Sequence, residues 1–176
     1  MSRKLHIGGK IKKDGWEILN ALPGPDVDHI CNANDLSSFE DNTFTEIYAS
    51  HILEHFDYAE ELSKTLKEWN RVLAPKGKIY ISVPDMDILA KLFLLKDQLN
   101  ADQRFQVMRM MFGGHVDEYD HHSVGLNTEF LGAFLEDSGF TNMQRVQEFN
   151  LFDDTSTFKF GGILISLNMI AEKLAE

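Results

Sequence analysis

Apolar and polar positions along this chain change period in a way that predicts strands alternating with helices. Residues 44–49 are rich in strand formers and stop at a polar Ser50-His51 pair. From Tyr58 to Leu73, apolar side chains recur at intervals of four and three, which places them on one face of a helix. A Pro-Lys-Gly run ends that helix, and a second strand follows at 78–83. The pattern indicates a parallel β-α-β unit.

The same alternation extends toward both ends of the chain. Further strands are predicted at 5–7, 16–19 and 27–31, and only six residues, 10–15, separate the glycine pair after the first strand from the second. Further helices are predicted at 87–96, 101–112 and 128–138. Residues 143–149 and 161–171 are expected to form a closing strand pair. We therefore expect one α/β domain over residues 1–176, with a mostly parallel sheet and an antiparallel tail.

Two of these helices carry apolar residues that are expected to face the core. In the helix at 128–138, Asn127 is the expected cap. The inward residues there are Phe130, Leu131, Phe134 and Leu135. The core stripe of the helix at 101–112 comprises Phe105, Met108, Met111 and Phe112. The alternative for this second stripe is the lining of an apolar acceptor pocket or a subunit interface.

Charge and cysteine usage narrow the class of protein. With 17 basic and 28 acidic residues the formal net charge is −11, which argues against nucleic acid or an anionic membrane as a main partner. The single cysteine, Cys31, excludes an internal disulfide and fits a reducing compartment. The basic N-terminus is followed by too short an apolar run for a signal peptide, and no run suits a bilayer span. We expect a cytoplasmic protein without membrane insertion.

Residues 39–55, FEDNTFTEIYASHILEH, resemble the class I S-adenosylmethionine-dependent methyltransferases, most closely the type 11 methyltransferase domain. Residues 68–77, EWNRVLAPKG, match that family's helix before its fifth strand, and residues 122–140 are similar to its last helix. The resemblance implies a doubly wound, Rossmann-like sheet of about seven strands. It also implies methyl transfer from S-adenosylmethionine as cofactor.

The resemblance further implies where that cofactor binds. The glycine turn Gly8-Gly9 would pass under its methionine part, and Ser50 and His51 would lie near the sulfonium. The family usually holds the ribose and the adenine amino group with acidic residues, and the matching positions here are Asn20 and Asn32. The residues expected to flank the adenine edge are Asn34, Asp35 and Leu36.

Two departures from the family pattern affect the expected affinity. Amides form weaker hydrogen bonds than carboxylates, so Asn20 and Asn32 are expected to weaken cofactor binding. The short segment at 10–15 leaves almost no room for the family's first helix, whose N-terminus normally faces an anionic ligand group. Lys10 or Lys12 is therefore the expected partner of the methionine carboxylate.

Three side chains are candidate catalytic residues. His51, at the carboxyl end of its strand, is the first candidate for cofactor contact or for a base, and helix capping is the alternative. Tyr119 and His122 are candidates for acceptor contact or proton removal, since glycines on both sides suit a mobile lid.

The polar segments around these candidates also have simpler interpretations. The run at 115–122 contains metal-ligand types, but its spacing matches no closed zinc site, so we expect a solvated loop and no metal. Glu54 and His55 are expected to form a local surface pair.

Together these observations favour S-adenosylmethionine-dependent methyl transfer to a small-molecule or glycan-type acceptor, where the acceptor class rests on family context. The alternative is a non-catalytic binding module with a degenerate methyltransferase fold, for which Asn20, Asn32 and the short first connection are the evidence. Loss of an outer helix would expose sheet surface that a second copy could cover, so a homodimer is a further hypothesis.

Overall fold

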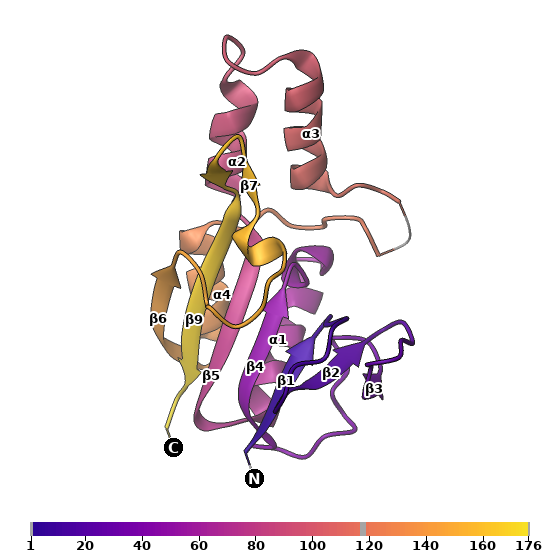
Figure 1. The fold of residues 1–176 in the computed structure, drawn as a ribbon. Coiled ribbons are helices and arrows are strands. Elements are labelled where there is room, and N and C mark those ends of the chain that lie inside the picture. The colour runs from indigo at the N-terminus through magenta and orange to yellow at the C-terminus, as the bar shows by residue number, and fades with distance from the viewer. Residues whose placement is uncertain (1, 117–118, 176) are drawn as a thin grey trace.

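The structure is a computed structural model, and it describes residues 2–116 and 119–175. Within these residues seven strands form one sheet in the order β3-β2-β1-β4-β5-β9-β6 (Figure 1). β1 to β5 are parallel, and β9 runs antiparallel between β5 and β6. The expected Rossmann-like α/β fold with an antiparallel C-terminal pair is confirmed. Its strands are β1 (Arg3–Ile7), β2 (Glu17–Asn20), β3 (His29–Ile30), β4 (Phe44–Ser50), β5 (Leu73–Pro84), β6 (Phe140–Val146) and β9 (Ser166–Lys173).

Helices lie on one face of the sheet and beyond one of its edges. Figure 1 shows α1 and α4 behind the sheet, while α2 and α3 stand beyond the carboxyl ends of the parallel strands. The helical elements are α1 (Glu61–Val72), α2 (Met86–Leu94), α3 (Ala101–Phe112) and α4 (Thr128–Asp137), with short 3-10 turns η1 (Leu53–His55) and η2 (Thr155–Thr157). A small ribbon of β7 (Lys159–Phe160) and β8 (Ile163–Leu164) follows η2.

The main core lies between the sheet and the α1–α4 layer. The period of two along the strands turns Leu5, Ile47 and Ile79 to this side, where all three are fully buried. Asn127 caps α4 as expected, because its side-chain oxygen accepts a hydrogen bond from the Phe130 N–H at 2.8 Å. The amphipathic face of α1 and the inward residues of α4 complete the core with Leu62, Leu66, Trp69, Leu131 and Leu135.

The opposite face of the sheet carries a row of aromatic residues. His6, Tyr48 and Tyr80 are neighbours in the register of β1, β4 and β5. The segment at 147–158 crosses this face (Figure 1), and the ring centroid of Phe152 lies 4.6 Å from that of Tyr48. The Tyr48 hydroxyl also donates a hydrogen bond to Asp154 at 2.8 Å. The crossing segment is therefore anchored to β4.

The short connection between β1 and β2 is confirmed, since residues 8–16 contain no helix. The Lys13 ammonium group donates to the Leu151 carbonyl and lies 5.1 Å from the ring centroid of Phe152. The connection is thus joined to the segment that crosses the aromatic face.

Several predicted boundaries and core assignments are wrong. α1 ends at Val72 and β5 starts at the next residue, before the Pro-Lys-Gly run that was expected to separate them. The predicted strand at 161–171 is divided between β8 and β9. Phe105, Phe112 and Phe130 are more than half exposed. α3 packs mainly against α2, and α4 turns one edge to solvent.

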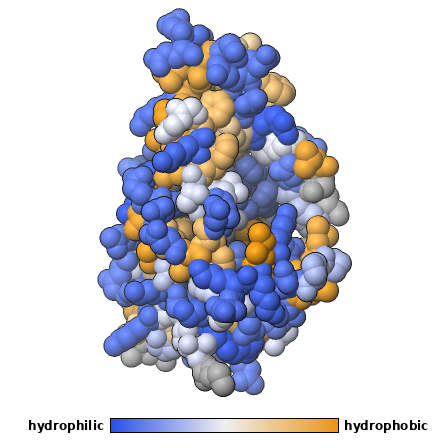
Figure 2. Space-filling view, viewed as in Figure 1, coloured by the Kyte–Doolittle hydropathy of each residue, from blue (hydrophilic) through white to orange (hydrophobic). Residues whose placement is uncertain are grey.

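The face of the molecule seen in Figure 2 is largely polar. Its hydrophobic side chains gather toward α2 and α3. Among the described residues no helix is both long and apolar enough to cross a membrane.

Candidate active site

His51 directly follows β4 at the edge where the parallel strands end. Its backbone φ is +54°, a left-handed conformation that few non-glycine residues adopt. Its N–H still donates to the Ser82 carbonyl of β5 at 2.8 Å, so the chain leaves the sheet only after this residue. The turn leads into η1 and brings Glu54 back beside the His51 ring.

Glu54 is buried at the centre of a group of half-buried histidines. It is 1% exposed, and its Oε1 atom lies 3.3 Å from His51 Nδ1 and 4.0 Å from His122 Nε2. The His55 and His122 ring centroids are 5.1 Å apart. Burial acts to raise the pKa of the Glu54 carboxyl, but the surrounding imidazoles, His51 first, outweigh burial and lower this pKa. The expected surface pair of Glu54 and His55 is therefore wrong for Glu54.

Backbone hydrogen bonds bring a distant loop to this group. The carbonyl oxygen of Glu54 accepts a hydrogen bond from the Ser123 N–H at 2.7 Å, and the His122 N–H donates to the Phe112 carbonyl at 3.1 Å. Nδ1 of His55 donates to the carbonyl of His121 at 3.0 Å. The structure thus brings together His51 and His122, two candidate catalytic residues that are far apart in sequence.

A hollow of about 420 Å³ opens beside these two histidines, within the size range of small-molecule sites. Burial lowers the pKa of the His122 imidazole, which keeps this ring neutral at neutral pH. Tyr119, the third candidate, lies in the same loop and is 48% exposed. The remaining lining of the hollow comes largely from α3 and the loop after it, with Gln106, Arg109, Met110, Gly113, Gly114 and Asp120.

The glycine turn after β1 is fixed by the protein itself. Gly8 has φ of +79°, and a Cβ there would overlap the Ile52 side chain. The Asn20 side-chain nitrogen donates to the Gly9 carbonyl at 3.0 Å, and its oxygen accepts from the Leu22 N–H at 3.0 Å. Both ends of the Asn20 amide are therefore engaged by backbone groups.

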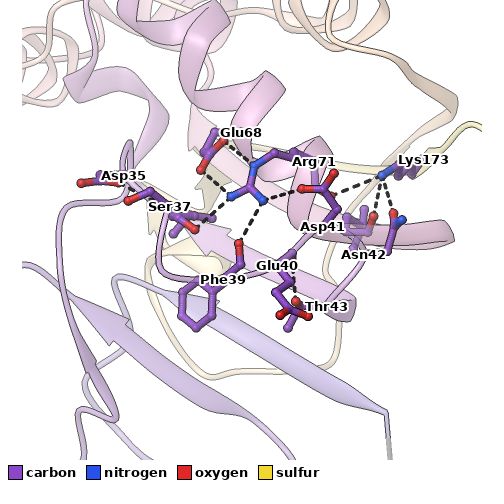
Figure 3. A network of polar contacts seen from close by, with 12 residues as sticks. Asp35, Ser37, Phe39, Glu40, Asp41, Asn42, Thr43, Glu68, Arg71 and Lys173 are labelled. Carbon is purple, nitrogen blue, oxygen red and sulfur yellow. Dashed lines mark hydrogen bonds and ion pairs between the residues drawn. The ribbon is translucent and has the colours of Figure 1, made fainter.

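The loop after β3 is held against α1 by Arg71. Its guanidinium donates to the carbonyls of Leu36 and Phe39 and pairs with Glu68 and Asp41 (Figure 3). Leu36 itself is fully buried in the core. The candidate adenine contacts Asn32, Asn34 and Asp35 are exposed on this anchored loop.

Comparison with known proteins agrees with this geometry. Residues 19–81 match the family described as Methyltransferase domain. A SAM-dependent methyltransferase from Methanosarcina mazei is 18% identical, with a TM-score of 0.59, over 99% of this chain and 93% of that one. A Burkholderia thailandensis 1,6-didemethyltoxoflavin-N1-methyltransferase, solved with 1,6-didemethyltoxoflavin and S-adenosylhomocysteine, is 13% identical, with a TM-score of 0.60, over 98% and 72%.

The CurJ carbon methyltransferase is 15% identical, with a TM-score of 0.57; the match covers 99% of this chain but spans only 49% of that one. No curated protein sequence matches the chain. The chain has the class I methyltransferase fold. Its resemblance to the type 11 methyltransferase domain is confirmed by the family match.

In this methyltransferase fold, the two lysines expected to bind the methionine carboxylate, Lys10 and Lys12, differ in their position relative to the sheet. Lys12 pairs with Asp28 at 3.4 Å and lines a hollow with Arg3 and Glu17, the first residues of β1 and β2. It therefore lies at the amino edge of the sheet, away from the expected cofactor, and this position disfavours its predicted role. Lys10 follows the glycine turn directly and stays a prediction.

The sequence analysis missed the central position of Glu54 in this group of histidines. The spacing of His51, Glu54 and His55 was the available signal, because residues three and four apart lie on one face of a helical turn. The contribution of His122 to the same group depends on the long return of the chain after α3.

Proposed function

We propose that this chain binds S-adenosylmethionine along the carboxyl edge of β1 to β4 and transfers its methyl group to a small-molecule or glycan-type acceptor in the hollow. The convergence of His51 and His122 on Glu54, beside a hollow of about 420 Å³, is the observation that carries the proposal. The family match and the shared fold support methyl transfer in general.

The edge of the sheet offers groups that fit the adenosine part of this cofactor. Asn32 and Asn34 are exposed amides on the loop anchored by Arg71, and amides bond both hydroxyl and amino groups. Lys10 supplies the positive charge for the methionine carboxylate. Asn20 already uses one N–H and its oxygen to hold the backbone at Gly9 and Leu22, so its second amide N–H is the donor left for the cofactor.

Bound S-adenosylmethionine supplies a methyl group on a positively charged sulfur. The task of the protein is then to align the acceptor, exclude water and receive a proton from an oxygen or nitrogen acceptor. His122 is suited to receive it, because burial favours its neutral form. His51 is held in place, since its Nε2 atom lies 3.0 Å from the Ser166 hydroxyl.

Calorimetric titration with S-adenosylmethionine and S-adenosylhomocysteine tests the cofactor part of the proposal. We expect saturable binding of both, and a stability gain of about 2.7 kcal/mol at a hundred times the dissociation constant. Asn32→Ala should weaken binding severalfold, whereas Ser38→Ala, an exposed change in the same loop, should not.

Transfer of a radiolabelled methyl group to pools of metabolites, glycans, RNA and protein tests the acceptor part. We expect label in the metabolite or glycan pool. Label confined to RNA or protein would refute the proposed acceptor class.

A non-catalytic module is the second candidate. Two features favour it: the Asn20 amide already bonds the Gly9 carbonyl, and no helix joins β1 to β2. Absence of binding at millimolar cofactor would support this alternative over methyl transfer.

A further inference from the structure

Glu54 is buried without the hydrogen bonds that a buried carboxylate needs. Among the described residues neither of its carboxylate oxygens has a hydrogen-bond partner, although Glu54 is only 1% exposed. Nδ1 of His122 is likewise buried without one. Such a carboxylate is strongly unfavourable unless donors or a cation compensate it. Apart from the contact with His51 Nδ1 at 3.3 Å, the Glu54 carboxylate therefore lacks a compensating donor among the described residues, and a cation beside it would compensate its charge.

Hydrogen bonds to the two neighbouring histidines fix where their lone pairs lie. The Ser166 hydroxyl has one hydrogen and donates it to the Thr155 carbonyl at 3.0 Å, so it accepts from Nε2 of His51. A neutral His51 thus directs the lone pair of Nδ1 at Oε1 of Glu54, 3.3 Å away. Two electron-rich atoms in this arrangement require a proton or a metal ion beside them.

His55 has the arrangement typical of a metal ligand. Its Nδ1–H donates to the backbone carbonyl of His121, which leaves the lone pair on Nε2. Metal-binding histidines commonly donate their second ring N–H to a backbone carbonyl, which fixes the tautomer and the ring orientation.

Glu54, His55 and His122 each offer one ligand atom, and these atoms all lie within 4.8 Å of one another. Two imidazoles and one carboxylate form a ligand set that Zn²⁺ and other first-row transition metals accept, with a position left open. Around a tetrahedral ion with bonds of about 2.0–2.1 Å, ligand atoms lie about 3.4 Å apart. The three side chains need to approach one another only slightly.

We propose that Glu54, His55 and His122 bind one divalent transition-metal ion of the Zn²⁺ type. This replaces the expectation that the protein has no metal. Of the run at 115–122, which contains metal-ligand types, His122 is the member of this set among the described residues.

The metal also suggests which acceptors the hollow takes, an extension that rests on the proposed function. His122 borders the hollow, so an open coordination position beside it would favour an acceptor that presents a hydroxyl oxygen. Metal coordination would lower the pKa of such an oxygen, so that its proton could pass to solvent water, and His122 would then serve as a ligand and not as the base.

Zn²⁺ and Co²⁺ binding to chelator-treated full-length protein tests the site in the absence of cofactor. We expect one equivalent of Zn²⁺ by calorimetry and elemental analysis, and intense visible absorption with Co²⁺. Glu54→Gln and His122→Asn should each weaken Zn²⁺ binding at least tenfold. His121→Asn is the matched control, because it removes an exposed imidazole and keeps the carbonyl that His55 uses.

Zn²⁺ binding that is absent, or unchanged in Glu54→Gln, would overturn the proposal. Where a variant fails to fold, paramagnetic broadening by Co²⁺ in the unmodified protein decides: broadening centred on the His55 and His122 rings supports the site, and broadening elsewhere refutes it. Titration of the metal-free protein with S-adenosylhomocysteine separates the two proposals. Cofactor binding without Zn²⁺ binding would refute the metal site alone, and Zn²⁺ binding without cofactor binding would count against the proposed function.

Discussion

The side-chain nitrogen of Asn20 donates a hydrogen bond to the carbonyl oxygen of Gly9 at 3.0 Å, across the carboxyl ends of β1 and β2. A carboxylate at position 20 would place an acceptor against this carbonyl oxygen, which is also an acceptor. The residue that the family uses for the ribose is thus incompatible with the present turn, whereas exposed Asn32 is under no such constraint.

Replacing Asn20 or Asn32 singly by the acidic residue of the family should therefore have different effects on stability and on cofactor affinity. We expect Asn20→Asp to lower the free energy of unfolding by about 1–2 kcal/mol without improving cofactor affinity. Asn32→Asp should tighten S-adenosylhomocysteine binding by about two- to tenfold through a charge-assisted bond. Urea unfolding and calorimetry measure the two effects. Tighter binding by Asn20→Asp would show that the turn rearranges when the cofactor binds.

His6 should make the protein less stable in mild acid. Burial lowers the pKa of this imidazole to about 4, below its unfolded value of about 6.5. Its stabilising contribution is therefore complete above about pH 6.5 and is lost as the pH falls toward 4, because the unfolded chain takes up the proton first. From pH 7 to pH 5 the loss should be about 1–2 kcal/mol.

Urea unfolding at both pH values checks the effect of His6. His6→Phe keeps a ring against Phe152 and should reduce the pH dependence by that amount. His121→Asn, at an exposed position, should retain the pH dependence of the unmodified protein. Equal pH dependence in all three proteins would contradict the prediction.

Arg71 should stabilise the loop after β3 more than an ordinary surface cation does. Arg71→Lys keeps the charge but cannot reach two carbonyls and two carboxylates together. We expect a loss of about 1–2 kcal/mol in the free energy of unfolding. Lys64→Met, which removes a fully exposed pair with Glu60, should have little effect. Denaturant titration distinguishes the two variants, and similar losses in both would argue against the network.

Asp85 joins α2 to β6, and its loss should be costly. One carboxylate oxygen caps α2 through the Asp87 and Ile88 N–H groups, while the other accepts from Arg145 at 2.6 Å. Asp85→Ala should lower the free energy of unfolding by about 2–4 kcal/mol. Asp85→Asn, which keeps a capping oxygen, should cost less. Thermal unfolding ranks them, and an Asn variant as unstable as the Ala variant would exclude a separate capping contribution.

The sequence predicted the elements whose identity depends on local pattern. The helix at 101–112 is correct at both ends, because Asn100 and Gln103 form a capping box and a glycine follows Phe112. The parallel pairing of β4 with β5 was also predictable, since a strand, a crossover helix and a second strand form a parallel β-α-β unit.

The site was less predictable, because it depends on contacts between distant segments. Glu54 is buried where the loop before α4 returns to η1, and the Ser123 N–H bonds the Glu54 carbonyl there. Phe105 and Phe112 match a helical core stripe, yet α3 stands beyond the sheet, where little covers its outer side. Periodicity identifies one face of a helix but not whether a second layer covers that face.

The inside position of β9 determines when the sheet can be completed during translation. β1 to β5 can pair in the order in which they leave the ribosome, but β6 pairs only with β9. Until residues 166–173 emerge, β5 presents an open backbone edge and β6 has no strand to join. A translational pause ahead of β9 would prolong this state, in which an open edge can pair with other nascent chains.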